Sequence, residues 1–307
     1  MSRRPLALAL LAVMAAGCGG GRTATTPTVE LPPVPRGAPI PRDPANGARP
    51  PVVVGALNFP EQKLLAQLYA QSLRAAGYRT STRADFGSDA ALLAALRRGR
   101  VDAVPEYVGV VLGGRGPHRP RAAFARARSL LARRGIIALP PTPFEDAPGF
   151  AMRRAAARGA RALSDLRGRS ARLVLAGPPG CRVRLDCARG LSRRYGLRFR
   201  RVLEVPASRR HRVLRSGRAD VSAVSTTDGA LAAGDLVLLA DDRRLLVPYQ
   251  VTLLLRRAPS RSFVVAVARL QPTLTTERMQ ALNARLDRGS PAARVAREHL
   301  RDAGLVR

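Results

Sequence analysis

The sequence is poor in the residues that build most cofactor sites and nucleic-acid surfaces. Its 307 residues include no Trp and only three Cys and three His, and aromatic residues make up 4%. The histidines His118, His211 and His299 are scattered, so they offer no clustered set of metal ligands. We also find no aromatic platform or zinc-finger spacing of the kind that nucleic-acid binding uses. The sequence therefore predicts no cofactor and no nucleic-acid partner.

Acidic residues are also few, because 21 Asp and Glu stand against 53 Lys and Arg, which gives a formal net charge of +32. Lys63 is the only lysine, and the Arg residues are spread along the whole chain beside abundant Ala, Gly and Pro. This pattern is typical of compositional bias in a GC-rich genome. A basic surface attracts polyanions whatever its origin, so a surface protein that binds nucleic acid or an anionic wall polymer stays a remote alternative.

Motifs of the common hydrolases and nucleotide-binding enzymes are missing. The sequence contains no Gly-x-Ser-x-Gly, no His-Glu-x-x-His and no phosphate-binding Gly-x4-Gly-Lys-Ser/Thr. Ser225, Thr226 and Asp228 combine hydroxyls with an acid, but a histidine would have to come from elsewhere in the sequence. We therefore expect that the protein is not an enzyme.

No apolar run after residue 50 is long enough to span a membrane. Residues 1–17 have the order of a secretion signal: two arginines, a short apolar stretch and a small-residue end. Cys18 follows, in an arrangement that resembles a bacterial lipobox, although Ala15 stands where that pattern prefers Leu. We expect an extracytoplasmic protein held at the cell membrane by acylated Cys18; an ordinary signal peptide with an incidental cysteine is the alternative.

Two further features fit an exported protein. Residues 18–50 are rich in Gly, Thr and Pro, which predicts a tether with polyproline character that holds the rest of the chain away from the membrane. Cys181 and Cys187 lie in a Pro-Pro-Gly-Cys-x5-Cys loop, and export favours a disulfide between them over two free thiols.

From residue 51 onwards, short apolar runs alternate with amphipathic stretches, a pattern that predicts α/β architecture. An internal echo adds to this: Leu96–Val104 is repeated at Leu214–Val221, and both copies indicate a helix, a glycine cap and a strand entered through Arg-x-Asp. The copies lie too far apart for a solenoid, whose periods run about 20 to 50 residues. We therefore predict two similar lobes, with each repeated strand leading the chain out of its lobe and with Asp102 and Asp220 at a hinge or sheet edge.

Several segments in order resemble motifs of one family, the substrate-binding proteins of ABC importers for glycine betaine, carnitine and choline. The resemblance covers about residues 51–307. The segments that carry it are Gly55–Gln62 (GALNFPEQ), Phe86–Ser88, Ala95–Gly99 with Asp102, Pro105–Gly109 (PEYVG), Thr226–Gly229 (TTDG) and Leu239–Tyr249.

The resemblance implies a two-lobed periplasmic-binding-protein fold of type II, with two strand crossovers and a cleft that closes on a small solute. Its expected division is lobe I from residues 51–107 and 227–307, and lobe II from residues 108–226. The protein would be a monomer that delivers its solute to ABC permease subunits. Family members commonly hold a quaternary ammonium group in a cage of aromatic side chains, because a methylated ammonium cannot donate strong hydrogen bonds and is held by ring faces instead.

In this sequence Tyr107 and Tyr249 match two tyrosine positions of the family's cage. Ser225 stands where the family often has another Tyr, and the stretch Asp146–Phe150 lacks a further one, which Phe150 replaces only if it faces the cleft. Asp89 stands where some members place a hydroxyl, so it favours a cation. The candidate ligand-binding residues are Asn58, Gln62, Ser88, Asp89, Tyr107, Phe150, Thr226, Thr227, Asp228 and Tyr249.

Some of these positions keep a structural alternative. Gln62 and Ser88 could instead cap a helix or satisfy backbone groups, and Asp228 could instead orient the hinge. The sequence favours a quaternary ammonium osmolyte of the glycine betaine or choline type. The alternative solute is a different cationic or zwitterionic compound, similar to an amino acid and held by Asp89 and Asp228.

Overall fold

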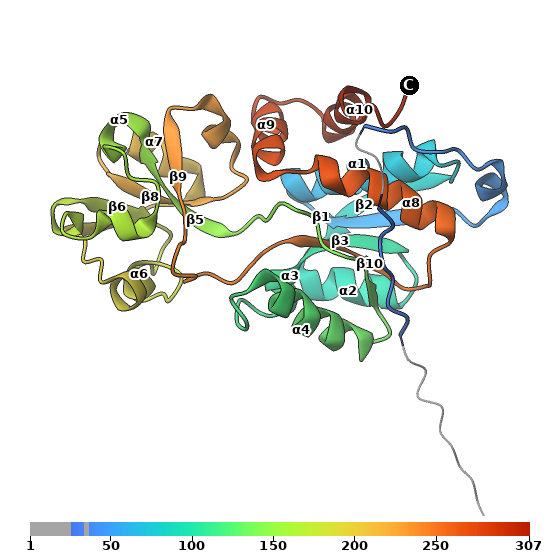
Figure 1. The fold of residues 1–307 in the computed structure, drawn as a ribbon, viewed down its shortest axis with the longest axis horizontal. Coiled ribbons are helices and arrows are strands. Elements are labelled where there is room, and N and C mark those ends of the chain that lie inside the picture. Colours follow the sequence, from blue (N-terminus) through green and yellow to red (C-terminus); the bar gives the residue numbers. More distant parts are fainter. Residues whose placement is uncertain (1–25, 34–36) are drawn as a thin grey trace, which may run out of the picture.

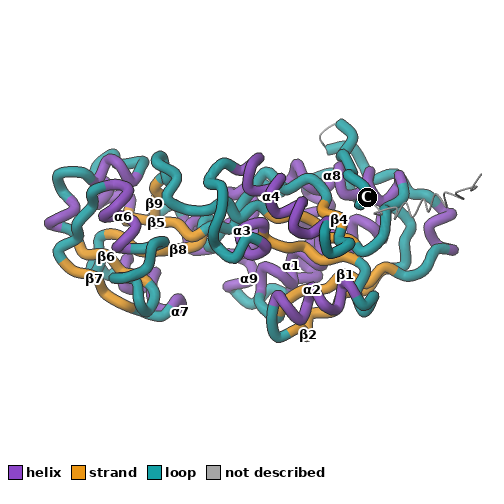
Figure 2. Tube along the Cα trace, turned by 90° about the horizontal axis from the view of Figure 1, so that it is seen from below, coloured by secondary structure: helices purple, strands orange, loops and turns teal. Residues whose placement is uncertain are grey.

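The computed structural model describes residues 26–33 and 37–307, which form two α/β lobes side by side (Figure 1). Each lobe is built on a five-stranded mixed sheet. Figure 2 shows the lobes from below, with α9 at the end of lobe I that faces lobe II. The predicted two-lobed fold is confirmed, whereas residues 1–17 and Cys18 lie outside the described residues.

The sheet of lobe I has the order β2-β1-β3-β10-β4, in which β1 runs parallel to β2 and β3, and β10 runs antiparallel to β3 and β4. Alternating side chains place Leu253 on the face covered by α1, α8 and α10, and Leu254 on the face covered by α2 and α4. The elements are β1 (Val52–Leu57), α1 (Pro60–Ala75), β2 (Thr80–Phe86), α2 (Asp89–Arg97), β3 (Ala103–Tyr107), α3 (Val108–Val111), α4 (Pro120–Ala132), β4 (Ile137–Ala138), β10 (Val251–Leu255), α8 (Arg261–Leu270), α9 (Thr276–Asp287) and α10 (Ala292–Asp302).

The sheet of lobe II has the order β7-β6-β8-β5-β9, with β6 parallel to β7 and β8, and with β5 antiparallel to β8 and β9. The predicted Cys181–Cys187 disulfide is present and packs in the core of this lobe. The elements are β5 (Pro148–Arg153), α5 (Arg154–Ala157), β6 (Val174–Gly177), α6 (Ala188–Tyr195), β7 (Arg201–Glu204), α7 (Ala207–Arg215), β8 (Val221–Ser225) and β9 (Leu236–Leu239).

The repeated strands are β3 and β8, and each is the middle strand of its sheet. The Asp102 carboxylate accepts a hydrogen bond from the N–H of Val53 at 3.0 Å, and Asp220 accepts one from Val174 at 2.8 Å. Each aspartate therefore ties the start of the middle strand to the neighbouring strand. The expectation of a sheet-edge role is wrong, because β3 and β8 are middle strands. The expectation of a hinge role is also wrong, because it is Tyr107, at the opposite end of β3 from Asp102, that reaches the cavity between the lobes.

The chain changes lobe later than the sequence predicts. After Tyr107 it adds α3, α4 and β4 to lobe I before it crosses at residues 145–147, and after Thr227 it adds β9 to lobe II before it returns near Tyr249. The expected boundaries at 107/108 and 226/227 therefore do not match the sheets. In each sheet the repeated strand pairs with an antiparallel strand, which is β10 in lobe I and β5 in lobe II. The apolar pattern of such a strand does not predict which sheet it joins.

The segment expected to be a free tether lies on lobe I where it is described. We call residues 26–33 and 37–50 the N-terminal strap; it runs across lobe I in blue in Figure 1. Thr26 donates to the carbonyl of Ala132 at 2.9 Å, and Ile40 donates its N–H to Leu305 at 2.9 Å. The side chain of Asn46 is fully buried and donates to the carbonyl of Ala76 at 2.8 Å. The strap is therefore packed into lobe I.

No helix of residues 26–33 and 37–307 could cross a membrane.

Candidate functional site

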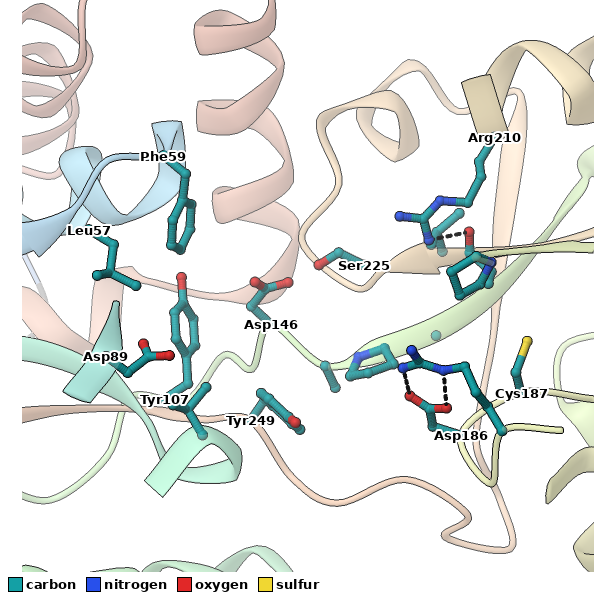
Figure 3. A pocket seen from close by; sticks show the side chains of 18 residues that line it. Leu57, Phe59, Asp89, Tyr107, Asp146, Asp186, Cys187, Arg210, Ser225 and Tyr249 are labelled. Carbon is teal, nitrogen blue, oxygen red and sulfur yellow. Dashed lines mark hydrogen bonds and ion pairs between the residues drawn. The ribbon is translucent and has the colours of Figure 1, made fainter. Parts of the chain in front are cut away.

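A cavity of about 470 Å³ lies between the two lobes. Its lobe I wall carries aromatic and acidic side chains, whereas its lobe II wall carries arginines and small residues (Figure 3). The lining residues are Leu57, Phe59, Asp89, Tyr107, Val110, Asp146, Ala147, Pro148, Gly149, Pro178, Arg184, Asp186, Cys187, Arg210, Ala223, Val224, Ser225 and Tyr249.

Three aromatic rings lie on the lobe I side of the cavity. Phe59 precedes α1, where Pro60 fixes the first turn, and its ring stacks on Tyr107 with the centroids 6.5 Å apart. Tyr249 lies in the segment that leads into β10, and its ring packs directly on the backbone of Gly109 in α3. A Cβ atom at Gly109 would lie 2.6 Å from Cζ of Tyr249, so only glycine permits this approach. Gly109 in α3 therefore sets the position of the Tyr249 ring, which forms one wall of the site.

The Tyr107 ring is fixed by a buried carboxyl group. Its hydroxyl donates to Oε1 of Glu61 in the first turn of α1 at 2.8 Å. Oε2 of Glu61 accepts from Nδ2 of Asn283 in α9 at 2.5 Å, and the same amide donates to the carbonyl of Thr227 at 2.9 Å. Burial raises the pKa of Glu61. Glu61 is not among the residues predicted from the sequence, although it stands inside the motif GALNFPEQ.

Asp146 is the acidic residue at the base of the cavity, in the first crossover. The hydroxyl of Thr227, in the segment after β8, donates to its Oδ1 at 2.9 Å. Burial, followed by the nearby charge of Glu61, raises the pKa of Asp146 to about 8. Asp89 lines the same cavity from the start of α2. The site thus offers two carboxyl groups beside the aromatic rings.

The lobe II wall presents a different charge. Arg184 is neutralised by Asp186 through hydrogen bonds of 2.8 and 2.5 Å. Arg210 in α7 donates to the carbonyl of Ala223 at 3.0 Å, and its Nε is buried without a partner in the described chain. Burial lowers the pKa of Arg210, and no carboxylate of the described residues forms an ion pair with it. Arg210 therefore lines the cavity without an ion-pair partner among the described residues.

The structure brings Tyr107, Tyr249 and Asp89 together at the cavity, as the sequence predicts. Phe150 is not there: its side chain is 1% exposed and packs in the core of lobe II, on the face of the sheet that α6 covers. The position opposite Ser225 on the neighbouring strand is Pro148, so the lobe II wall has no ring where the family's tyrosines were expected.

The remaining candidates do not line the cavity. Gln62 is fully buried and donates to the carbonyl of Pro105 at 3.0 Å, which holds α1 against β3. Ser88 caps α2 by accepting from the N–H of Ala91 at 3.2 Å. Asn58 is exposed. Thr226 ties the end of β8 to the first crossover, because its hydroxyl accepts from the N–H of Ala147 at 2.9 Å.

Asp228 binds a histidine rather than facing the cavity. Its Oδ2 lies 2.5 Å from Nε2 of His211 in α7. The Ser225 hydroxyl lies 3.3 Å from the hydroxyl of Thr227 and is not bonded to His211, so no Ser-His-Asp chain forms. The described residues also contain no group of three or more side chains placed to hold a metal ion.

Comparison with known proteins gives a consistent result. Residues 50–302 match the family model described as the substrate binding domain of an ABC-type glycine betaine transport system. A glycine-betaine-binding protein from Pseudomonas aeruginosa is 29% identical over 274 residues, which is 82% of this chain and 88% of that protein.

Two solved structures are similar in fold. The crystal structure of a glycine betaine/carnitine/choline ABC transporter protein has a TM-score of 0.76 at 23% identity, covering 82% of this chain and 98% of the other. Apo YehZ from Escherichia coli has a TM-score of 0.74 at 22% identity, covering 83% of this chain and 99% of the other.

Proposed function

The chain belongs to the family of substrate-binding domains of ABC-type glycine betaine transport systems, and from this premise we propose that its own solute is a zwitterionic quaternary ammonium osmolyte such as glycine betaine. The observation that carries the proposal is the division of charge across the cavity, with rings and carboxyls on lobe I and an open arginine on lobe II. The protein is a solute-binding protein of an ABC importer and not an enzyme.

The lobe I wall suits a methylated ammonium group. Such a group presents apolar methyls with a delocalised positive charge, and each ring face contributes about 0.5 to 2 kcal/mol of cation–π attraction. Tyr107 and Tyr249 offer two rings, and Phe59 lies stacked behind Tyr107. The carboxyl groups of Asp89 and Asp146 add longer-range attraction for the same charge.

The lobe II wall suits a carboxylate. The guanidinium of Arg210 can donate to two carboxylate oxygens in a fixed planar geometry, and a partly desolvated charge gains more from such a pair than an exposed one. Choline has no carboxylate, so it would leave Arg210 without a partner. We therefore expect glycine betaine and proline betaine to bind more tightly than choline.

The second candidate is a zwitterionic solute with a primary ammonium group. The observation that favours it is the lobe II wall, where Pro148 and Ser225 stand in place of rings while two carboxyl groups remain. A primary ammonium would donate hydrogen bonds to Asp89 and Asp146 and would need fewer ring faces. Asp228, predicted together with Asp89 for this role, is bonded to His211 and does not line the cavity.

Binding would draw the lobes together about the two crossovers, and permease subunits would recognise the closed form. We further propose that the protein acts as a monomer outside the cytoplasm and is attached to the membrane through Cys18. Mass spectrometry of the mature protein tests this attachment: a diacylated Cys18 is expected, and an unmodified residue would contradict it.

Calorimetric titration tests the solute. Wild-type protein is titrated with glycine betaine, choline and lysine, and thermal shifts are recorded in parallel, since a ligand at 100 times its dissociation constant stabilises the native state by about 2.7 kcal/mol. We expect Tyr249→Ala to weaken glycine betaine and choline alike, and Arg210→Gln to weaken glycine betaine while leaving choline unchanged. Arg193→Gln on the exposed side of α6 is the charge-matched control. Binding of lysine alone would favour the second candidate, and binding of none of the three would contradict the proposal.

A further inference from the structure

Three carboxyl groups meet where the crossovers pass the base of the cavity. Glu61 extends from α1, Asp146 lies in the first crossover, and Asp228 follows β8. They lie close enough to interact: the charge of Asp228 raises the pKa of Glu61, and the charges of Glu61 and Asp228 raise that of Asp146. This is a costly arrangement, because like charges withdrawn from water repel one another strongly.

The neutralising groups around Asp146 are few. Tyr107 and Tyr249 face it as neutral phenols, and Thr227 donates one hydrogen bond. Arg210 interacts electrostatically with Asp228, and His211 contacts the same carboxylate through its Nε2. In the described chain no cation forms an ion pair with Asp146 or Glu61.

Two buried carboxyl groups without a cation share a proton near neutral pH. Burial is the largest cause for both, and it raises the pKa of Asp146 to about 8 and raises that of Glu61 as well. The hydrogen bonds of Glu61 to Tyr107 and Asn283 favour its ionised form, which leaves the proton on Asp146. We therefore expect Asp146 to be protonated in the empty cavity at pH 7.

Asp146 is also the member of the cluster that the cavity exposes to a ligand. It lines the 470 Å³ space, whereas Glu61 is 7% exposed and does not. In Figure 3 its carboxyl group lies between Tyr107 and Ser225, near Tyr249, and so beside the place where the rings would hold a cation. This placement is independent of the titration and points to a positively charged occupant.

We propose that Asp146 is the counter-ion of the solute's cationic group and that solute binding releases the proton held by Asp146 into the solvent. The inference rests on the proposed function, because it needs a cation in the cavity. No covalent bond of the solute changes: one positive charge enters and one proton leaves, so the charge of the buried cluster stays constant. A fixed positive charge beside a carboxyl group stabilises its ionised form, which supplies the coupling.

The sign of the pH dependence follows directly. Above about pH 8 the acid is already ionised in the empty protein, so binding releases no proton and affinity is highest. Below that pH, binding must displace the proton, and the dissociation constant should rise by as much as about tenfold per pH unit. Glycine betaine is a suitable probe, because its ammonium charge is permanent.

Calorimetry of glycine betaine binding in phosphate and in Tris at pH 7 measures the number of protons released from the difference in apparent enthalpy. We expect nearly one proton at pH 7 and nearly none at pH 9 for the wild type. Asp146→Asn should release none and bind with an affinity that does not change between these pH values. Glu61→Gln, which keeps an acceptor for Tyr107 but removes the neighbouring charge, should release less than the wild type at pH 7.

The matched control is Glu106→Gln. Glu106 is fully buried in β3, and burial raises its pKa to about 8 as well, but it does not line the cavity. It accepts the N–H of Tyr107 at 2.8 Å, which glutamine can also do. The control should release the same number of protons as the wild type. If Glu106→Gln abolishes the release, or if the wild type binds glycine betaine without releasing a proton, this proposal is overturned and the proposed function stands. If no cationic solute binds, both fall.

Discussion

Replacing Gly109 by alanine should damage the solute site although Gly109 is not itself one of the lining residues. The new Cβ would lie 2.6 Å from Cζ of Tyr249, whereas two carbon atoms pack best at about 3.5 to 4.0 Å. The ring must therefore retreat by about 1 Å or rotate away. Gly109 lies in the helix α3, whose backbone tolerates alanine, so the clash with the ring is the only obstacle.

The loss expected from this change is that of one ring face, about 0.5 to 2 kcal/mol, which corresponds to a twofold to 30-fold higher dissociation constant for glycine betaine. Calorimetric titration measures the affinity, and urea unfolding of the same sample shows whether the fold is intact. Gly87→Ala is the control, because no atom lies within 4 Å of a Cβ at that position. If Gly109→Ala binds as tightly as the control, the ring of Tyr249 does not form a wall of the occupied site.

Three further predictions concern stability, each measured by urea unfolding. Replacing Cys181 and Cys187 by serine should cost about 2 kcal/mol, because the disulfide closes a short loop; no loss would mean that the loop is already fixed by its packing. His299 is buried, which lowers its pKa to about 4, so stability should be complete above pH 6.5 and fall by about 2 kcal/mol by pH 5, and His299→Leu should remove this slope. Asn46→Ala should cost about 1 to 3 kcal/mol while Arg42→Ala costs little, and equal effects would contradict the integral strap.

The sequence was sufficient for the fold and for the two tyrosines of the cavity. The repeated helix–glycine–strand unit predicted two lobes, and the resemblance to the family's motifs singled out Tyr107 and Tyr249, which line the cavity. The lobe boundaries could not be predicted in the same way. The antiparallel strands β5 and β10 have the same apolar character as any buried strand, and only long-range pairing assigns each to its sheet.

The charged residues of the site could not be predicted from the sequence, for a different reason. Arg210 is one of many arginines, and only the orientation of α7 turns it towards the cavity. Asp146 lies in a stretch whose only sequence signal is the absence of the family's tyrosine, and nothing in that pattern indicates that its carboxyl group lines the cavity. The sequence does not determine which face of strand β5 carries Phe150, and in the structure its side chain points into the core. The strap was missed because Val29, Leu31 and Ile40 reach the core without any helical or strand period.

Lobe II is a closed excursion of the chain. It begins after Glu145 and ends before Gln250, two residues joined by an antiparallel bridge, while the strap and the C-terminal helix both belong to lobe I. A restraint on the N-terminus would therefore act on lobe I, and lobe II would be the lobe that moves. Phe59 and Tyr107 would stay with the stationary half, Asp146 and Tyr249 would lie in the two crossovers, and Arg210 would arrive with the moving half. A carboxylate on the solute would then bind Arg210 and hold lobe II in the closed position. A solute with only a cationic group would occupy the lobe I side of the site and leave lobe II free to move.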